Sequence, residues 1–128
     1  MNSADKRDLL QVLREELSFL DSGGYKRTGK AWRPALLLED SVACVNYGDP
    51  FHSQPCKQCI LSRLAPREKR ELPGSCRHIP LNKDGETLDL LYRYGTEAEI
   101  EETYRKWLVA TIRQLESDHG HKLYSAAT

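Results

Sequence analysis

The chain has 128 residues, of which 39% are hydrophobic and 30% are charged, and its 19 basic and 19 acidic side chains give a formal net charge of zero. This composition is that of an ordinary globular protein and excludes a low-complexity chain or one that is basic throughout. No apolar run approaches the ~20 residues of a membrane-spanning helix, and the amino terminus has no apolar signal segment. We therefore expect one cytoplasmic domain over residues 1–128, without membrane contact.

The amino-terminal residues 1–21 predict an amphipathic helix, because leucines recur there at three- and four-residue steps. The stripe consists of Leu9, Leu10, Leu13, Leu17 and Leu20. Gly23 and Gly24 follow directly, where a left-handed helix cap would use glycine. We interpret the apolar stripe as a face that packs against the core rather than as a groove for a partner.

The central residues 32–94 predict a small antiparallel β unit. Its short strands are expected at 36–38, 42–45, 77–81 and 87–93. The last two of these flank Asp84-Gly85, a dipeptide that favours a tight hairpin turn with positive φ.

The carboxyl-terminal residues 96–119 predict a second helix. Thr96 and Glu99 have the spacing of a capping box, in which each side chain satisfies a backbone amide of the first turn. Both helices have one apolar face, so we expect them to cover the same core. The side chains expected to be largely buried are Leu13, Leu17, Tyr104, Leu108 and Ile112.

All four cysteines lie between the two predicted helices, at Cys44, Cys56, Cys59 and Cys76. Cys56-Lys57-Gln58-Cys59 is a C-x-x-C knuckle, which supplies two thiolates from one tight turn, and structural zinc prefers four tetrahedral ligands of this kind. Thiols stay reduced in the cytoplasm that we expect for this chain. We therefore predict one structural zinc ion bound by all four cysteines.

The spacing departs from that of a standard zinc ribbon, because eleven residues separate Cys44 from the knuckle. Unliganded cysteines, disulfides and an iron–sulfur cluster stay open as alternatives. His78 follows Cys76 by two residues and on a strand would point to the same face, so His78, or His52, could replace a cysteine ligand. The more ordinary interpretation of both histidines is a surface or outer-shell position.

Together these patterns predict an α+β fold, in which a small zinc-pinned antiparallel β unit is flanked by an amino-terminal and a carboxyl-terminal amphipathic helix. A zinc ion closed by four thiolates has no open position for a substrate. We therefore interpret the chain as a zinc-ribbon-like binding module rather than an enzyme. A metal-dependent hydrolase, or a thiol oxidoreductase that uses the knuckle from Cys56 to Cys59, stays open as the enzymatic alternative.

The basic charge of the chain is concentrated in residues 22–80, which carry 10 basic and 5 acidic side chains, whereas both flanking regions are net acidic. The surface that we expect to bind a partner carries Lys26, Arg27, Lys30, Arg33, Lys69 and Arg70, with Tyr25 and Trp32 among them. Cations interleaved with aromatic rings suit phosphate contacts and base stacking. The expected partner is an unknown protein or a nucleic acid; the plainer interpretation is a solvated face that offsets the acidic helices.

Overall fold

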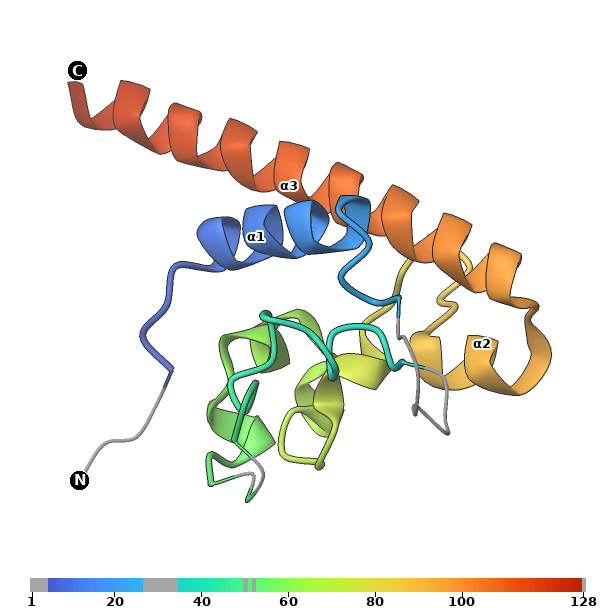
Figure 1. Cartoon of the computed structure of the whole chain (residues 1–128). Coiled ribbons are helices and arrows are strands. Elements are labelled where there is room, and N and C mark those ends of the chain that lie inside the picture. Colours follow the sequence, from blue (N-terminus) through green and yellow to red (C-terminus); the bar gives the residue numbers. More distant parts are fainter. Residues whose placement is uncertain (1–4, 27–34, 50, 52, 128) are drawn as a thin grey trace.

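The computed structural model describes residues 5–26, 35–49, 51 and 53–127, with side chains described as far as residue 118. These residues form three α-helices, α1 (Leu9–Asp21), α2 (Leu88–Tyr94) and α3 (Glu97–Ala127). Short 3-10 helices lie between α1 and α2, namely η1 (Cys56–Gln58), η2 (Ile60–Leu64), η3 (Arg67–Lys69) and η4 (Ser75–His78). In Figure 1 the pair α1–α3 lies on one side of the molecule, and the segments with η1 to η4 lie beneath it.

Helix α1 confirms the predicted amino-terminal helix, although it begins later than expected. The carboxylate of Asp8 accepts a hydrogen bond from the Gln11 amide at 2.9 Å, so Asp8 is the N-cap. At the other end the Gly24 amide donates to the Phe19 carbonyl at 2.8 Å, and Gly23 adopts φ +82°. This is a Schellman motif, and it explains why glycine follows the helix.

Helix α3 confirms the capping box, since the Thr96 amide donates to the Glu99 carboxylate at 2.8 Å and the Glu99 amide donates to the Thr96 hydroxyl at 3.2 Å. The helix runs past the predicted end at residue 119 to Ala127. A glycine inside a helix costs only about 1 kcal/mol relative to alanine, so Gly120 does not end it. Among the described residues no helix, α3 included, is long and apolar enough to cross a membrane.

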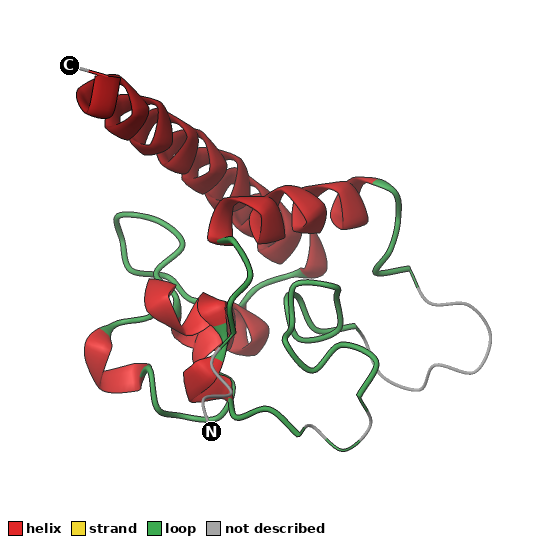
Figure 2. Cartoon of the chain, turned by 90° about the vertical axis from the view of Figure 1, so that its left-hand side faces the viewer, coloured by secondary structure: helices red, strands yellow, loops and turns green. Residues whose placement is uncertain are grey.

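Helices α1 and α3 pack against one core, as predicted, and they run antiparallel. Two ion pairs join them, Arg14 with Glu116 at 2.7 Å and Arg105 with Asp21. Exposed pairs of this kind stabilise little, so the burial of apolar side chains holds the helices together. Of the five side chains predicted to be buried, Leu13, Tyr104, Leu108 and Ile112 are buried and Leu17 is half-buried. Helix α3 projects beyond the start of α1 (Figures 1 and 2).

A buried carboxylate joins α1 to α3 and to the chain that follows α1. Glu16 has no exposed side-chain surface and accepts hydrogen bonds from the hydroxyls of Tyr25 and Tyr104. The Tyr25 hydroxyl in turn accepts a hydrogen bond from the Leu38 amide at 2.9 Å. Burial raises the pKa of the Glu16 carboxyl, against the opposing effect of these hydroxyl groups.

The predicted α+β fold is wrong, because none of the described residues belongs to a strand (Figure 2). Residues 36–38 enter a tight turn, in which Leu38 has φ 67°. Residues 87–93, predicted as a hairpin strand, instead form most of α2, where the Thr87 hydroxyl accepts from the Leu90 amide at 3.2 Å. Apolar runs this short contain too few periods to distinguish a strand from a helix.

The remaining expected strands are also replaced by turns and 3-10 helix. Residues 42–45 form turns, and residues 77–81 begin inside η4. The dipeptide Asp84-Gly85 does form a turn, in which Gly85 has φ +76° and the Leu81 amide donates to the Glu86 carbonyl at 2.7 Å. This turn connects η4 to α2 instead of joining two strands.

Candidate metal centre

The four predicted ligands come from three separate segments of the chain. Cys44 lies in the turn segment (residues 36–46), Cys56 begins η1, Cys59 follows η1 directly and Cys76 lies in η4. All four are free thiols; Cys59 is buried and the other three are half-buried.

The electrostatics of these thiols indicate that the fold gathers them. Burial is the main effect that raises the pKa of Cys76, and the negative charges of Glu39 and of the other three thiolates raise it further. Burial also raises the pKa of Cys44, and the thiolates of Cys59 and Cys56 add to that effect. These charge effects are smaller than the effect of burial, and they place the four cysteines in the same neighbourhood of the fold without showing a contact between their sulfurs.

The neighbourhood is not arranged as a finished metal site. Among the described residues, no group of three or more histidine, cysteine, aspartate or glutamate side chains is placed to hold a metal ion. His78 lies in the 3-10 helix η4, where residues two apart do not share a face as they do on a strand. The geometric reason for expecting His78 beside Cys76 is therefore absent. His52 lies outside the described residues.

Two tyrosine hydroxyls fix the turn segment that carries Cys44. Tyr25 accepts from the Leu38 amide, and Tyr92 of α2 accepts from the Leu37 amide, each at 2.9 Å. The Ser41 hydroxyl donates to the Leu38 carbonyl at 3.1 Å and accepts from the amide of residue 43 at 3.1 Å. These bonds hold Leu38 in a left-handed conformation that is unfavourable for leucine.

A side-chain-to-backbone clamp links the turn segment to the knuckle. Asn46 donates through Nδ2 to the Gln54 carbonyl and accepts through Oδ1 from the Gln54 amide, each at 2.9 Å. Asn46 follows Cys44 by two residues, and Gln54 precedes Cys56 by two. Within the knuckle, the Cys59 amide donates to the Cys56 carbonyl at 3.0 Å. The clamp therefore brings the first two cysteines of the chain towards each other across the intervening loop.

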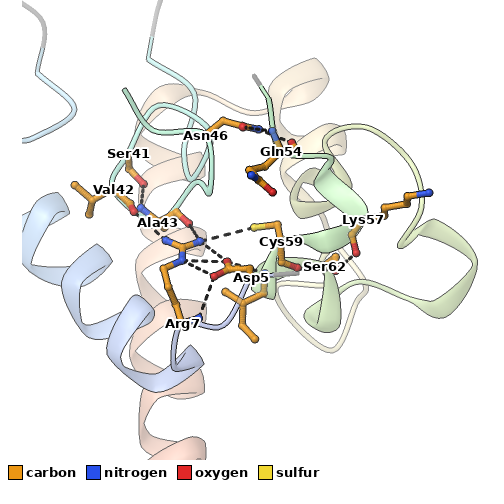
Figure 3. Close-up of polar contacts among 11 residues, drawn as sticks. Asp5, Arg7, Ser41, Val42, Ala43, Asn46, Gln54, Lys57, Cys59 and Ser62 are labelled. Carbon is orange, nitrogen blue, oxygen red and sulfur yellow. Dashed lines mark hydrogen bonds and ion pairs between the residues drawn. The ribbon is translucent and has the colours of Figure 1, made fainter. Parts of the chain in front are cut away.

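Two residues that precede α1, Asp5 and Arg7, lie against this centre, and sequence analysis gave them no role there (Figure 3). The Arg7 guanidinium donates to the Ala43 carbonyl at 2.9 Å and lies 4.0 Å from the Cys59 sulfur. The Asp5 carboxylate accepts from the Ile60 amide at 3.0 Å and forms an ion pair with Arg7 at 2.7 Å. Asp5 and Ile60 are 55 positions apart, so no local spacing in the sequence indicates their contact.

The charges of Asp5 and Arg7 stabilise each other. Burial opposes ionisation of Asp5, but hydrogen bonds from Arg7 and from the Ile60 amide outweigh it and lower the pKa of the Asp5 carboxyl to about 2. Burial raises the pKa of the Cys59 thiol, and the Arg7 cation acts in the opposite direction. A permanent cation therefore faces the buried thiol of the knuckle.

The predicted basic surface is only partly described. Arg27, Lys30, Trp32 and Arg33 lie outside the described residues. Lys26 is exposed and Lys69 is half-buried. Arg70 is exposed, but its guanidinium donates to the Ala65 carbonyl at 2.9 Å and to the Arg63 carbonyl at 3.1 Å. Arg70 therefore also holds the chain between η2 and η3.

Comparison of the chain with models of known protein families, with curated proteins and with solved structures finds no match. Any function assigned to the chain must therefore rest on the residues themselves.

Proposed function

We propose that the chain is a small structural zinc module in which one zinc ion is bound by Cys44, Cys56, Cys59 and Cys76. The observation that supports this most is the convergence of four free thiols from three segments that are distant in the sequence. Thiolates are soft, anionic ligands that suit zinc. Binding would require the turn segment and the knuckle to move the sulfurs closer together than they are in this structure.

The region around the cysteines is one where a metal would contribute most to stability. The described residues between α1 and α2 form only turns and 3-10 helices, whose hydrogen bonds are poorer in geometry than those of an α-helix. Eight of the sixteen described residues of the buried core come from this region, Leu61 and Ile79 among them, so a metal would add to apolar burial there rather than replace it. The binding free energy of a structural zinc ion contributes directly to folding.

Metal analysis of the reduced chain, purified without added metal, tests the proposal. We expect about one zinc ion per chain, and the replacement Cys59→Ser should lower this content and loosen the central region. Lys57→Ser is a matched control, since it changes an exposed residue inside the same knuckle. A zinc content far below one per chain in the wild type would exclude the site. Bound iron together with a visible absorption band would show that the cysteines bind an iron–sulfur cluster instead of zinc.

We further propose that this module binds a partner through its basic central surface, and that it does so in the cytoplasm, where the thiols stay reduced. The exposed Lys26 and the half-buried Lys69 are the described members of that surface whose amines can reach a phosphate. Titration with mixed DNA and RNA at two salt concentrations distinguishes the partners. A steep loss of affinity with salt supports a nucleic acid, and no binding at low salt excludes a nucleic acid and leaves an unknown protein as the partner.

A paired variant makes the binding test specific. Lys26→Ala combined with Lys69→Ala should weaken nucleic-acid binding and reduce its salt dependence. Lys106→Ala is the control, because Lys106 is also exposed but is paired with Glu102 at 3.0 Å on the acidic helix α3. Equal losses in both variants would show that binding does not use the proposed surface.

No described feature favours either enzymatic alternative. A reactive thiol needs a lowered pKa, such as the amino terminus of an α-helix provides. The knuckle instead opens a 3-10 helix of three residues, and burial raises the pKa of Cys59. We therefore propose a binding role without turnover.

A further inference from the structure

We propose that residues 5–8, the amino-terminal clasp, form the outer shell of the zinc site and hold the chain on either side of it. Zinc binding and docking of the clasp would then stabilise each other. The inference rests on the proposed zinc site and adds residues to it that are not ligands. Its basis is a set of contacts between the clasp and the residues next to two of the four cysteines (Figure 3).

The clasp touches the backbone on both sides of the site. Arg7 donates to the carbonyls of Val42 at 3.3 Å and of Ala43 at 2.9 Å, and Ala43 directly precedes Cys44. The Asp5 amide donates to the Gln58 carbonyl at 2.9 Å. Gln58 directly precedes Cys59. The clasp therefore connects the backbone beside Cys44 in the turn segment to the backbone beside Cys59 in the knuckle.

The far side of Cys59 is held as well. The Asp5 carboxylate accepts from the Ile60 amide at 3.0 Å, and Ile60 directly follows Cys59. The Asp5 side chain is only 3% exposed, so this bond lies out of solvent. The clasp therefore ties the residues next to Cys44 to the residues next to Cys59. If the two cysteines move towards a common metal, the clasp limits how their neighbours shift relative to each other.

The charge of the clasp suits a thiolate site. A zinc ion bound by four thiolates leaves an excess of negative charge, which a nearby cation stabilises. Arg7 supplies such a cation, 4.0 Å from the Cys59 sulfur and close enough to Cys44 for the charges to interact. Asp5 fixes the fork of the guanidinium through hydrogen bonds from Nε and Nη2 at 2.9 and 2.7 Å. Residues that orient and neutralise ligands in this way contribute about 10- to 100-fold to metal affinity.

Competition with a chromogenic zinc chelator measures the effect of Arg7 on affinity. We expect Arg7→Gln to weaken zinc binding by about 10- to 100-fold and Arg7→Lys to weaken it less, because lysine keeps the charge but loses the fork. Arg14→Gln is the control, since Arg14 is an arginine of α1 whose exposed ion pair with Glu116 lies on the helix pair. Its zinc affinity should equal that of the wild type, and helix content measured by circular dichroism should be the same in all variants.

Hydrogen exchange provides a readout that does not depend on affinity. Because coupling between two binding events is reciprocal, zinc should slow exchange of the Ile60 amide in the wild type and do so much less in Asp5→Ala, which lacks the acceptor for that amide. If the wild type and Arg7→Gln bind zinc equally well, and zinc does not change exchange of the Ile60 amide, the role proposed for the clasp is wrong but the zinc site still stands. If the wild type binds no zinc, the zinc site fails and the clasp fails with it.

Discussion

Glu16 offers the sharpest test of how α1, α3 and the turn segment are joined. Replacing it with alanine removes the acceptor for the hydroxyls of Tyr25 and Tyr104, and Tyr104 has no exposed surface. A buried donor that loses its partner costs about 1–3 kcal/mol. Two hydroxyls lose their acceptor, but the variant no longer has to bury a carboxylate, which offsets part of the cost. We therefore expect Glu16→Ala to lower the free energy of unfolding by about 2–4 kcal/mol.

Urea unfolding of chains that carry Trp32→Phe, followed by circular dichroism and by Trp107 fluorescence, measures this loss. Trp107 is buried and stacks on Tyr104 with ring centroids 5.8 Å apart, so its fluorescence reports on the same contact. Glu15→Ala is the matched control, because Glu15 is the exposed neighbour, and surface changes usually stay within about 0.5 kcal/mol. Equal losses for the two alanine variants would refute the assignment of Glu16 as the joint.

The dependence on pH separates hydrogen bonding from charge. Because the pKa of Glu16 is raised in the folded chain above its ordinary value of 4.5, the folded state binds more protons than the unfolded state over that interval. Stability from this group is therefore fully present below pH 4.5 and is lost as the pH rises through the folded pKa. Glu16→Gln keeps an acceptor oxygen but cannot titrate, so the stability difference between it and the wild type should grow in its favour over that interval. A difference that is constant with pH would contradict the buried carboxyl.

Three further replacements test other parts of the fold. Leu108→Ala should cost about 2–5 kcal/mol in urea unfolding, because Leu108 is fully buried; an unmoved transition would mean that the helix face is assigned wrongly. Thr96→Ala should cost about 1 kcal/mol through loss of the cap, with Thr103→Ala in the same helix as its control. Asp5→Asn should cost on the order of 2 kcal/mol at neutral pH in chelator-treated protein. Since the pKa of Asp5 is lowered from 3.8 to about 2, the gap should close as the pH falls through that interval, and a gap that persists at pH 2 would exclude the Arg7 pair.

The terminal helices could be predicted because their signals are local and repeated. The leucines of α1 and the apolar face of α3 extend over several turns, and the Thr96–Glu99 pair marks a start by itself. One signal within that same pattern was missed. Glu16 stands in the apolar stripe, three residues after Leu13, and a carboxylate at such a position indicates buried partners.

The fold of the central region could not be predicted from local patterns. A run such as residues 36–38 is equally compatible with a strand and with a turn, and what decides between them is a pair of tyrosine hydroxyls, Tyr25 and Tyr92, from elsewhere in the chain. The cysteines themselves were visible in the sequence, but the clasp was not. Its contacts join residues 5 and 7 to residues 42–43 and 58–60, and the sequence has no pattern that links such distant positions.

The turn segment is where these contacts meet. Glu16 acts on it through the Tyr25 hydroxyl at Leu38, and the clasp acts on it through Arg7 at Ala43. Ser41 lies between Leu38 and Ala43, and its hydroxyl forms a hydrogen bond with the backbone of each. Cys44 directly follows Ala43. A shift of the helix pair at Glu16 would therefore move the first proposed zinc ligand relative to the knuckle, although Glu16 itself is no ligand. In this arrangement the helices do more than cover a core, because their packing sets the position of Cys44, the first of the four proposed ligands.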